Sequence, residues 1–357
     1  MIILCKNICK CFRSMYSWDN KDIINILTCL NENYIEYLDI LINSLVEKSK
    51  SNIRLFICVW DIVTQELIQK QIDISRNIKI EIIVFEKEKI QKLISFQTLH
   101  PPECYFRILI QQIIPTEIKK IIYLDPDIIV NKSLEKLYHV YQPKLISGVR
   151  DHCCEEYAKK YIKKLTWNNL EKYINAGVLI INMEKWRKNN IEEKMISNIK
   201  KFWKELKLLD QDLINIVLKD DIDILPAEWN HFYPAKCEKN NICIYHMVGR
   251  GKWLSILNTS LETKMLYLKY SNNVKNRFLY KSMIMCSHLL ISWPLGLFIK
   301  TKYKIRYKFK KNTFLDYMGL ILLAYPPVML ILLRGVYREY AKFGKKEILK
   351  SLWEIIK

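Results

Sequence analysis

Two aspartates close an apolar run near the middle of the chain. Residues 121–130 read IIYLDPDIIV, so Asp125 and Asp127 flank one proline at the end of a stretch suited to a buried strand. Two carboxylates this close repel each other unless a cation neutralises them. Their oxygens are the usual ligands of divalent cations such as Ca²⁺ and Mg²⁺. Asp-Pro-Asp is also a good turn former, so the tripeptide alone leaves both a metal site and a plain turn open.

Small residues interrupt a later apolar stretch, YINAGVLIINM, at Asn175, Ala176 and Gly177. Small residues inside a strand let a ligand or another backbone approach closely, or they mark a bulge. Further on, the tripeptide 210–212 (Asp-Gln-Asp) begins a predicted helix. Acidic residues there have an ordinary role as caps and partners of the helix dipole, besides any catalytic one.

A fourth segment, YHMVGRGKW, combines His246 with two glycines, at 249 and 251, and with Lys252. These residue types suit a loop that closes over a metal-bound phosphate, although a lone histidine is more often structural. Cys237 and Cys243 lie close to this histidine in sequence. No second pair of metal ligands follows, which argues against a zinc site. The chain holds 11 cysteines without regular spacing, which favours a reducing compartment.

Strands and helices alternate through the first 257 residues. The predicted strands are 23–30, 53–60, 78–85, 119–125, 144–150, 173–183 and 241–247, and the predicted helices are 33–49, 64–72, 104–114 and 210–220. This alternation is typical of an open α/β sheet with right-handed crossovers. Ligands bind beyond the carboxyl ends of the strands in such sheets, which is where Asp125 and Asp127 lie.

The basic charge is concentrated at the end of the chain. The formal net charge is +20, and residues 258–357 hold 19 Lys and Arg against 5 Asp and Glu, a net charge of +14. A charge of this sign favours polyanionic partners, nucleic acid among them. The nearly balanced remainder and the lack of a nucleic-acid-binding motif argue against a nucleic-acid-binding protein. The first twelve residues, MIILCKNICKCF, lack the pattern of a signal peptide.

The four motifs together resemble those of retaining glycosyltransferase family 8. YLDPDIIV, YINAGVLIINMEKWRKNNI, DQDLINIVL and HMVGRGKW follow the family's order and approximate spacing over residues 22–257. The resemblance implies an α/β GT-A nucleotide-sugar fold, with a Rossmann-like mixed sheet flanked by helices. It also implies a UDP-sugar donor and Mn²⁺ as the cofactor, with Mg²⁺ as the alternative.

The resemblance also implies a role for each motif residue. The implied metal ligands are Asp125, Asp127 and His246. The residues implied to bind the diphosphate are Gly249 and Lys252, and those implied to line the donor-sugar pocket are Arg107, Asp151, Asn175, Ala176 and Gly177. Asp210 and Gln211 are the implied catalytic pair at the sugar, with Gln211 opposite the leaving group.

The nucleobase end departs from the family pattern. Asn31 stands where the family usually has an aspartate that binds uracil, and its amide keeps hydrogen-bonding ability without the charge. Tyr34 stays in place to stack on the base. A sugar nucleotidyltransferase, the alternative enzyme, would need a glycine-rich phosphate loop after the first strand, and residues 28–34 (TCLNENY) contain no glycine.

The resemblance predicts transfer of a hexose, glucose or galactose, to a glycan or lipid-linked acceptor in surface polysaccharide or lipopolysaccharide synthesis. In the segment 258–357, the apolar stretches 283–299 and 314–333 are interrupted by prolines and an aspartate, so neither is a clean membrane span. Residues 271–357 are predicted to lie on an anionic membrane surface, on the cytoplasmic face where nucleotide sugars are found. A helical cap on the enzyme is the alternative.

Overall fold

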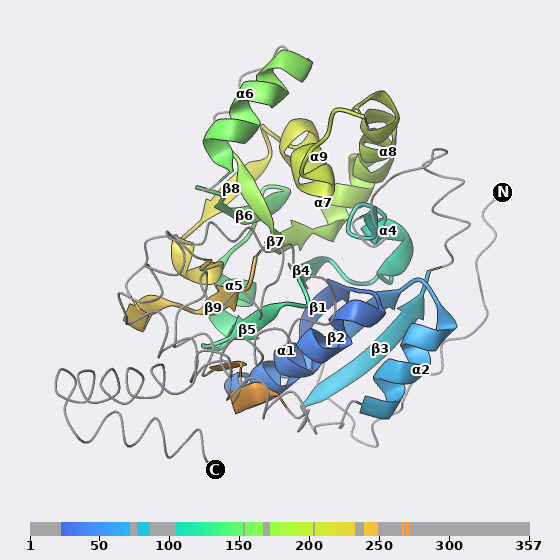
Figure 1. Ribbon diagram of the computed structural model, residues 1–357, viewed down its shortest axis with the longest axis vertical. Helices are drawn as coiled ribbons and strands as arrows, with labels where there is room; N and C mark the ends of the chain where they lie inside the picture. The colour runs from blue at the N-terminus through green and yellow to red at the C-terminus, as the bar shows by residue number, and fades with distance from the viewer. Residues whose placement is uncertain are drawn as a thin grey trace, which may run out of the picture. The chain divides into compact units, whose positions relative to one another are not determined.

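A seven-stranded mixed sheet organises the described part of the chain, in the order β3-β2-β1-β4-β7-β6-β8 (Figure 1). In chain order its strands are β1 (Ile23–Cys29), β2 (Asn52–Val59), β3 (Ile78–Val84), β4 (Lys120–Leu124), β6 (Ile146–Arg150), β7 (Ile174–Asn182) and β8 (Ile222–Leu225). Strands β3, β2, β1 and β4 are parallel neighbours, as are β6 and β8, whereas β7 runs antiparallel to both β4 and β6. The predicted α/β sheet is confirmed.

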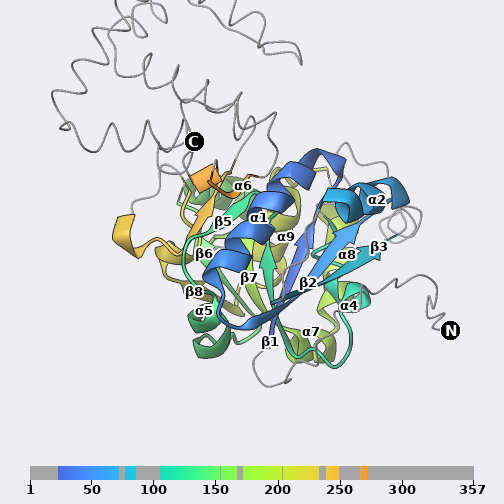
Figure 2. The same ribbon diagram turned by 90° about the horizontal axis from the view of Figure 1, so that it is seen from below.

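Helices cover both faces of this sheet. The α-helices are α1 (Ile35–Lys48), α2 (Ile62–Gln71), α4 (Ile110–Ile113), α5 (Glu135–Val140), α6 (Glu155–Thr166), α7 (Met183–Lys188), α8 (Ile191–Phe202) and α9 (Leu209–Val217), and the short 3-10 helices are η2 (Glu32–Tyr34), η4 (Ala227–Trp229) and η5 (Lys239–Asn241). Helix α1 packs on one face, and α8 and α9 pack on the other (Figure 2).

The strands are apolar on both sides because each face carries a core. In β4, Ile121 and Tyr123 join the core beneath α8 and α9, while Ile122 and Leu124 join the core beneath α1. This alternation is the period-two geometry of a strand. It explains why β4 reads as a continuous apolar run instead of an alternating one.

A second, two-stranded sheet lies beside the first, and the sequence did not predict it. Strand β5 (Ile128–Val130) pairs antiparallel with β9 (Ile244–His246), so that Ile128 lies opposite His246. The strand predicted at 241–247 therefore exists in shortened form and pairs outside the main sheet. The short apolar run after Asp127 carried too few residues to indicate a separate strand.

The helix predicted at 104–114 is mostly wrong. Residues 105–109 form turns, with Ile108 N donating to Tyr105 O at 3.0 Å, and the α-helix covers Ile110–Ile113 alone. Its early amide, Gln111 N, donates to the buried Glu192 of α8 at 3.2 Å. A helix end must satisfy its free N–H groups, and a carboxylate from another helix does so here. Apolar spacing alone could not reveal that partner.

The computed structural model describes residues 23–71, 77–85, 105–152, 154–166, 172–202, 204–232, 239–248, 266–267 and 269–271. The chain divides into two compact units, Met1–Gly249 with Lys269–Asn272, and Arg250–Leu268 with Asn273–Lys357, and the strands belong to the first. Among the described residues, no helix has the length and apolar character needed to cross a bilayer. The predicted loop residues Gly249 and Lys252, and nearly all of the predicted basic tail, lie outside these ranges.

Candidate metal and sugar-transfer site

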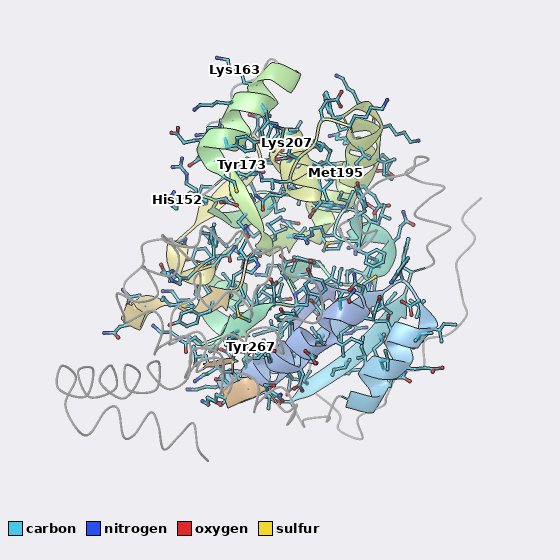
Figure 3. The ribbon with its side chains drawn as sticks, viewed as in Figure 1. His152, Lys163, Tyr173, Met195, Lys207 and Tyr267 are labelled. Carbon is cyan, nitrogen blue, oxygen red and sulfur yellow. The ribbon has the colours of Figure 1, made fainter. Side chains whose placement is uncertain are left out.

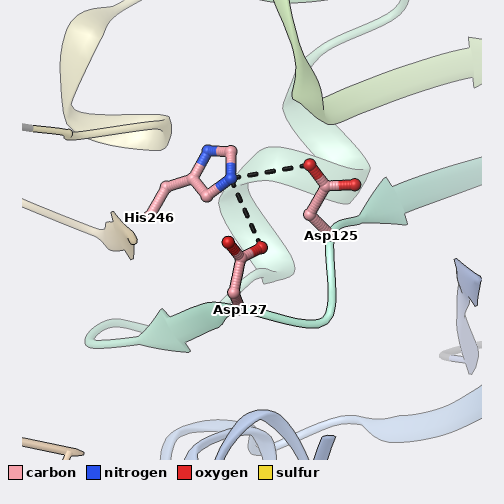
Figure 4. Close-up of side chains that lie close together, drawn as sticks. All are labelled: Asp125, Asp127 and His246. Atoms are coloured by element: carbon pink, nitrogen blue, oxygen red, sulfur yellow. Dashed lines mark ion pairs between the residues drawn. The ribbon is translucent and has the colours of Figure 1, made fainter. Parts of the chain in front are cut away.

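Asp125 and Asp127 lie between the end of β4 and the start of β5. Asp125 N donates to Gly177 O at 2.8 Å, which continues the pairing of β4 with β7 by one residue. Met247 N donates to Asp127 O at 3.1 Å, just beyond β9. The small β5–β9 sheet therefore brings His246, distant in sequence, to the aspartate pair (Figure 4).

These three side chains form a compact donor set. His246 Nε2 lies 3.5 Å from Asp125 Oδ2 and 3.5 Å from Asp127 Oδ1. Among the described residues, this set can offer three ligand atoms within 4.8 Å of one another. Asp127 and His246 are buried, with 2% and 6% of their surfaces exposed. Two carboxylates and an imidazole fit a transition-metal cation such as Mn²⁺ better than Mg²⁺, because nitrogen donors favour the transition metal.

A chain of amide hydrogen bonds orients the histidine. His246 Nδ1 lies 2.9 Å from Asn230 Oδ1, an acceptor, while Asn230 Nδ2 donates to Asn175 Oδ1 at 2.9 Å. Nδ1 therefore carries a proton in either charge state, and Nε2, which faces the carboxylates, is the nitrogen that would ligate a metal, as expected of an imidazole with an outer hydrogen-bond partner. Asn230 was missed by sequence reasoning, because a single asparagine in AEWNHF carries no motif.

The surroundings of the donor set favour positive charge. Burial alone would lower the pKa of His246, but the charges and hydrogen bonds of Asp127 and Asp125 raise this pKa to about 9. Burial would raise the pKa of Asp125, yet Arg107, His246 and Tyr123 together hold it well below its usual range. A divalent cation would supply positive charge between the two carboxylates, so Asp125, Asp127 and His246 fit a metal site.

Gly177 leaves the space that this arrangement needs. A Cβ at this position would lie 2.1 Å from His246 Cε1 and 2.9 Å from Asp125 Oδ2. Real Cβ atoms do not approach other atoms so closely, so the imidazole or the carboxylate would have to move. The glycine within the apolar strand thus allows close approach of ligand side chains, which is one of the two interpretations open from the sequence.

Arg107 connects the donor set to a second acidic group. Its side chain lies over the ring of Tyr123, with Cζ 4.3 Å from the ring centroid. It donates to Asp125 Oδ1 at 2.9 Å and to Ala176 O at 2.6 Å, and its Nε lies 2.7 Å from Asp210 Oδ2. Burial raises the pKa of Asp210 to about 6, although Arg107 opposes this shift.

Gln211 and Asp151 complete a polar group beside the start of β7. Gln211 Oε1 accepts from Ala176 N at 3.1 Å, and Gln211 Nε2 donates to Asp151 Oδ2 at 3.0 Å. Asn175 Nδ2 donates to the same Asp151 oxygen at 3.2 Å. The structure therefore brings together residues from three segments of the sequence, around 151, 175 and 211.

Asn31 and Tyr34 lie beyond the carboxyl end of β1. Since β1 and β4 are parallel neighbours, this is the sheet edge at which Asp125 lies. Asn31 Oδ1 accepts from Asn33 N at 3.0 Å and so caps η2, which leaves its amide N–H₂ for other partners. Tyr34 is half-buried at the start of α1. Cys243, considered from the sequence as a zinc ligand, is no member of the donor set that the described residues form, and Cys237 lies outside them.

Comparison with known proteins agrees with this geometry. The family described as Glycosyl transferase family 8 matches residues 25–256. General stress protein A of Bacillus subtilis (strain 168) is 28% identical over 216 residues, covering 58% of this chain and 74% of that protein. A lipopolysaccharide 1,2-glucosyltransferase of Escherichia coli is 26% identical over 226 residues, covering 62% of this chain and 66% of that enzyme, just under two thirds.

Solved structures show the same fold. The galactosyltransferase LgtC, in complex with donor and acceptor sugar analogues, has a TM-score of 0.57 at 19% identity over 70% of this chain and 97% of LgtC. The bifunctional glycosyltransferase WbbM has a TM-score of 0.58 at 18% identity over 76% of this chain and 53% of WbbM. The fold is thus that of GT-A glycosyltransferases. The family match covers more than half of the chain, and the chain belongs to glycosyltransferase family 8.

Replacing Gly177 by alanine should weaken divalent-cation binding while leaving the fold intact. We expect Mn²⁺ affinity to fall at least about tenfold, as when metal ligands lose their orientation, because the added Cβ displaces His246 or Asp125. Titration of free Mn²⁺ by electron paramagnetic resonance measures this. Gly148→Ala is the matched control, since its Cβ would instead meet Ile174 and Leu179. Equal Mn²⁺ affinity in both variants would contradict the assigned geometry.

Proposed function

We propose that this chain is a metal-dependent, retaining hexosyltransferase that moves glucose or galactose from a UDP-sugar to a glycan or glycolipid acceptor. The observation that carries the proposal is the adjacency of two groups at one sheet edge. Asp125, Asp127 and His246 form a cation-binding set, and Arg107 joins it directly to Asp210. Gln211 lies on the other side of Ala176, whose backbone contacts both Arg107 and Gln211.

In this proposal Asp125, Asp127 and His246 would hold Mn²⁺, and the bound cation would supply positive charge against the charge that gathers on the departing UDP diphosphate. Arg107 keeps Asp125 in place and ionised. Gly249 and Lys252, which lie outside the described residues, bind the diphosphate itself. Gly177 leaves the space in which the His246 imidazole and the Asp125 carboxylate lie.

The sugar-facing residues in this proposal are Asp151, Asn175, Ala176, Asp210 and Gln211. Breaking the anomeric bond gives the sugar oxocarbenium character, which the Gln211 carbonyl dipole stabilises. The carboxylates near it are already engaged: Asp210 pairs with Arg107 at 2.7 Å, and Asp151 accepts from both Asn175 and Gln211. These contacts support attack by the acceptor on the face from which UDP departs, with the UDP phosphate helping to take the acceptor proton.

The nucleobase site is proposed at Asn31 and Tyr34. The Asn31 side chain caps η2 through its oxygen and keeps its N–H₂ to donate to a base carbonyl. The 3-10 helix η2, which comes directly after this cap, has the sequence ENY and contains no glycine. The segment after β1 therefore lacks the glycine-rich phosphate loop that a sugar nucleotidyltransferase would use.

The acceptor and location are also proposals. A relative covered to 66% of its length is a lipopolysaccharide glucosyltransferase, which supports surface polysaccharide synthesis. The net charge of +14 in residues 258–357 supports binding of residues 271–357 to anionic lipid at the cytoplasmic face of the membrane. Such a position would place the active site beside a lipid-linked acceptor.

Metal removal should stop the reaction. UDP release from UDP-glucose or UDP-galactose should fall to background in EDTA and return with Mn²⁺ more fully than with Ca²⁺. Asp127→Ala and His246→Ala should each lose activity at least about 100-fold and bind UDP more weakly, because the diphosphate loses its counter-charge. Asp220→Ala, at an exposed acidic residue, should behave as wild type. Full activity in EDTA would overturn the metal assignment.

Replacement of Gln211 should separate turnover from nucleotide binding. Gln211→Ala should reduce turnover by about tenfold or more, with UDP affinity nearly unchanged, because Gln211 lies at the sugar and not at the diphosphate. Gln142→Ala, at an exposed glutamine, is the control. Proton NMR of the product should show an α-linkage formed from the α-linked donor. A β-linked product would rule out retention.

Membrane association should depend on the basic tail. The full chain should sediment with vesicles containing phosphatidylglycerol at low salt and be partly released at high salt. Changing Lys302, Lys304, Lys308 and Lys310 to glutamine should weaken binding by up to about a thousandfold, since each is worth about 1 kcal/mol near an anionic surface. The same change at Lys160, Lys163, Lys188 and Lys200, exposed in the first unit, should have little effect. Equal losses in both sets would refute a tail-specific site.

A further inference from the structure

We propose that Tyr173 and Asp212 are positioning residues that fix the side chain of Gln211. This inference rests on the proposed role of Gln211 at the donor sugar. Neither residue is a member of the cation-binding set, and neither was assigned a role at the sugar from the sequence. Tyr173 immediately precedes β7, and Asp212 lies in the first turn of α9.

The orientation of the Gln211 amide is set by three partners. Ala176 N can donate only, so the group that it meets at 3.1 Å is Gln211 Oε1. Gln211 Nε2 then has two acceptors, Asp151 Oδ2 at 3.0 Å and the Tyr173 hydroxyl at 3.3 Å. Nε2 can use both of its protons in this way only if the Tyr173 oxygen accepts instead of donating.

Asp212 decides that direction. A tyrosine hydroxyl has a single proton, and the Tyr173 hydroxyl lies 2.6 Å from Asp212 Oδ1. Gln211 Nε2 donates and cannot accept, whereas a carboxylate is a strong acceptor, so the Tyr173 hydroxyl donates its hydrogen bond to Asp212 Oδ1. The lone pairs of the Tyr173 oxygen are then left to accept from Gln211 Nε2.

Asp212 is itself held from three directions. Its side chain is fully buried, and it accepts hydrogen bonds from the hydroxyls of Tyr161 and Tyr173 and, at 2.9 and 2.8 Å, from the backbone N–H groups of Lys207 and Leu208. A buried carboxylate needs such partners. They join α6, the start of β7 and the turn before α9, and the labelled residues Tyr173 and Lys207 lie in this region (Figure 3).

The hydrogen bonds of Asp212 also hold an unfavourable backbone conformation at the start of α9. Leu209, the first residue of α9, has a φ of 49°, a left-handed value uncommon for leucine. The two N–H groups bound by Asp212 belong to the residues just before it. Strained backbone persists where surrounding contacts determine it. Asp212 therefore fixes both the backbone entering α9 and the hydroxyl that meets Gln211.

Two tyrosines provide a matched pair of variants. Tyr161→Phe and Tyr173→Phe each remove one hydroxyl that donates to the same oxygen of Asp212. Of these two hydroxyls, that of Tyr173 also contacts Gln211, at 3.3 Å. Any general weakening of the Asp212 anchor should thus be common to both variants, while loss of Gln211 positioning should be specific to Tyr173→Phe.

The kinetic experiment measures UDP release by the full chain with Mn²⁺ and a UDP-hexose. Tyr173→Phe should lower kcat about tenfold, with the KM for donor and the Kd for UDP changed less than about twofold, because misplacement of a group by under 1 Å has such costs. Tyr161→Phe should lower kcat less than about threefold. In a Gln211→Ala background, Tyr173→Phe should have no further effect, as expected when one residue acts through another. Equal kcat losses in the two tyrosine variants, or additive losses with Gln211→Ala, would overturn the proposal.

A second measurement separates this inference from the proposed function. In protein labelled with ¹⁵N-glutamine, the Gln211 side-chain signal, assigned by its absence in Gln211→Ala, should move in Tyr173→Phe and stay in place in Tyr161→Phe. If wild-type protein releases no UDP from any UDP-hexose, the proposed function fails while this shift still supports the positioning. An unmoved signal in Tyr173→Phe refutes the positioning, whatever the activity.

Discussion

The meeting of two aspartates at the end of β4 is the constraint on which the rest of the site depends. Two like charges about 4 Å apart repel by about 4 kcal/mol at an effective dielectric constant of 20. Positive charge must therefore reach Asp125 and Asp127 from elsewhere in the chain. Arg107 reaches Asp125 at 2.9 Å, and His246 reaches both aspartates at 3.5 Å. The turns before α4 bring Arg107 to this point, and the small β5–β9 sheet brings His246.

The single antiparallel strand of the main sheet, β7, brings the sugar-facing residues to the aspartates. Because β7 runs against β4, its first residues lie beside the last residues of β4, and Asp125 N pairs with Gly177 O. The segment Asn175–Gly177 therefore borders the aspartates on one side and Asp151 and Gln211 on the other. An all-parallel sheet would place the start of this strand at the opposite edge. The reversal of β7 thus joins a cation-binding set to a sugar-facing set.

The sequence predicted the strands and motifs that are determined by residues adjacent in the chain. Continuous apolar runs predicted β1 to β4 because these strands are buried on both faces, and DPD and NAG were recognisable because their residue types are unusual inside such runs. What it missed depends on contacts distant in the chain. The helix predicted at 104–114 gives way to turns where Arg107 reaches Asp125 and Asp210. The short strand β5 pairs with β9, which lies more than 110 residues later in the chain and also bridges to His231. The roles of Asn230 and Tyr173 depend on hydrogen bonds to side chains distant in the sequence, so the sequence alone could not predict them.

The choice of an amide at position 211 follows from the charge around it. Asp151, Asp210 and Asp212 all lie within one residue or one hydrogen bond of Gln211, and Asp210 already has its pKa raised to about 6 by burial. A carboxylate at 211 would add like charge to this group. It would also be unable to donate to Asp151 or to Tyr173, both of which Gln211 Nε2 contacts. A glutamine places a carbonyl dipole among these carboxylates while its N–H₂ group satisfies two of its neighbours. The proposed site can therefore favour positive charge on a sugar through fixed dipoles and neighbouring carboxylates, with no nucleophile of its own at position 211.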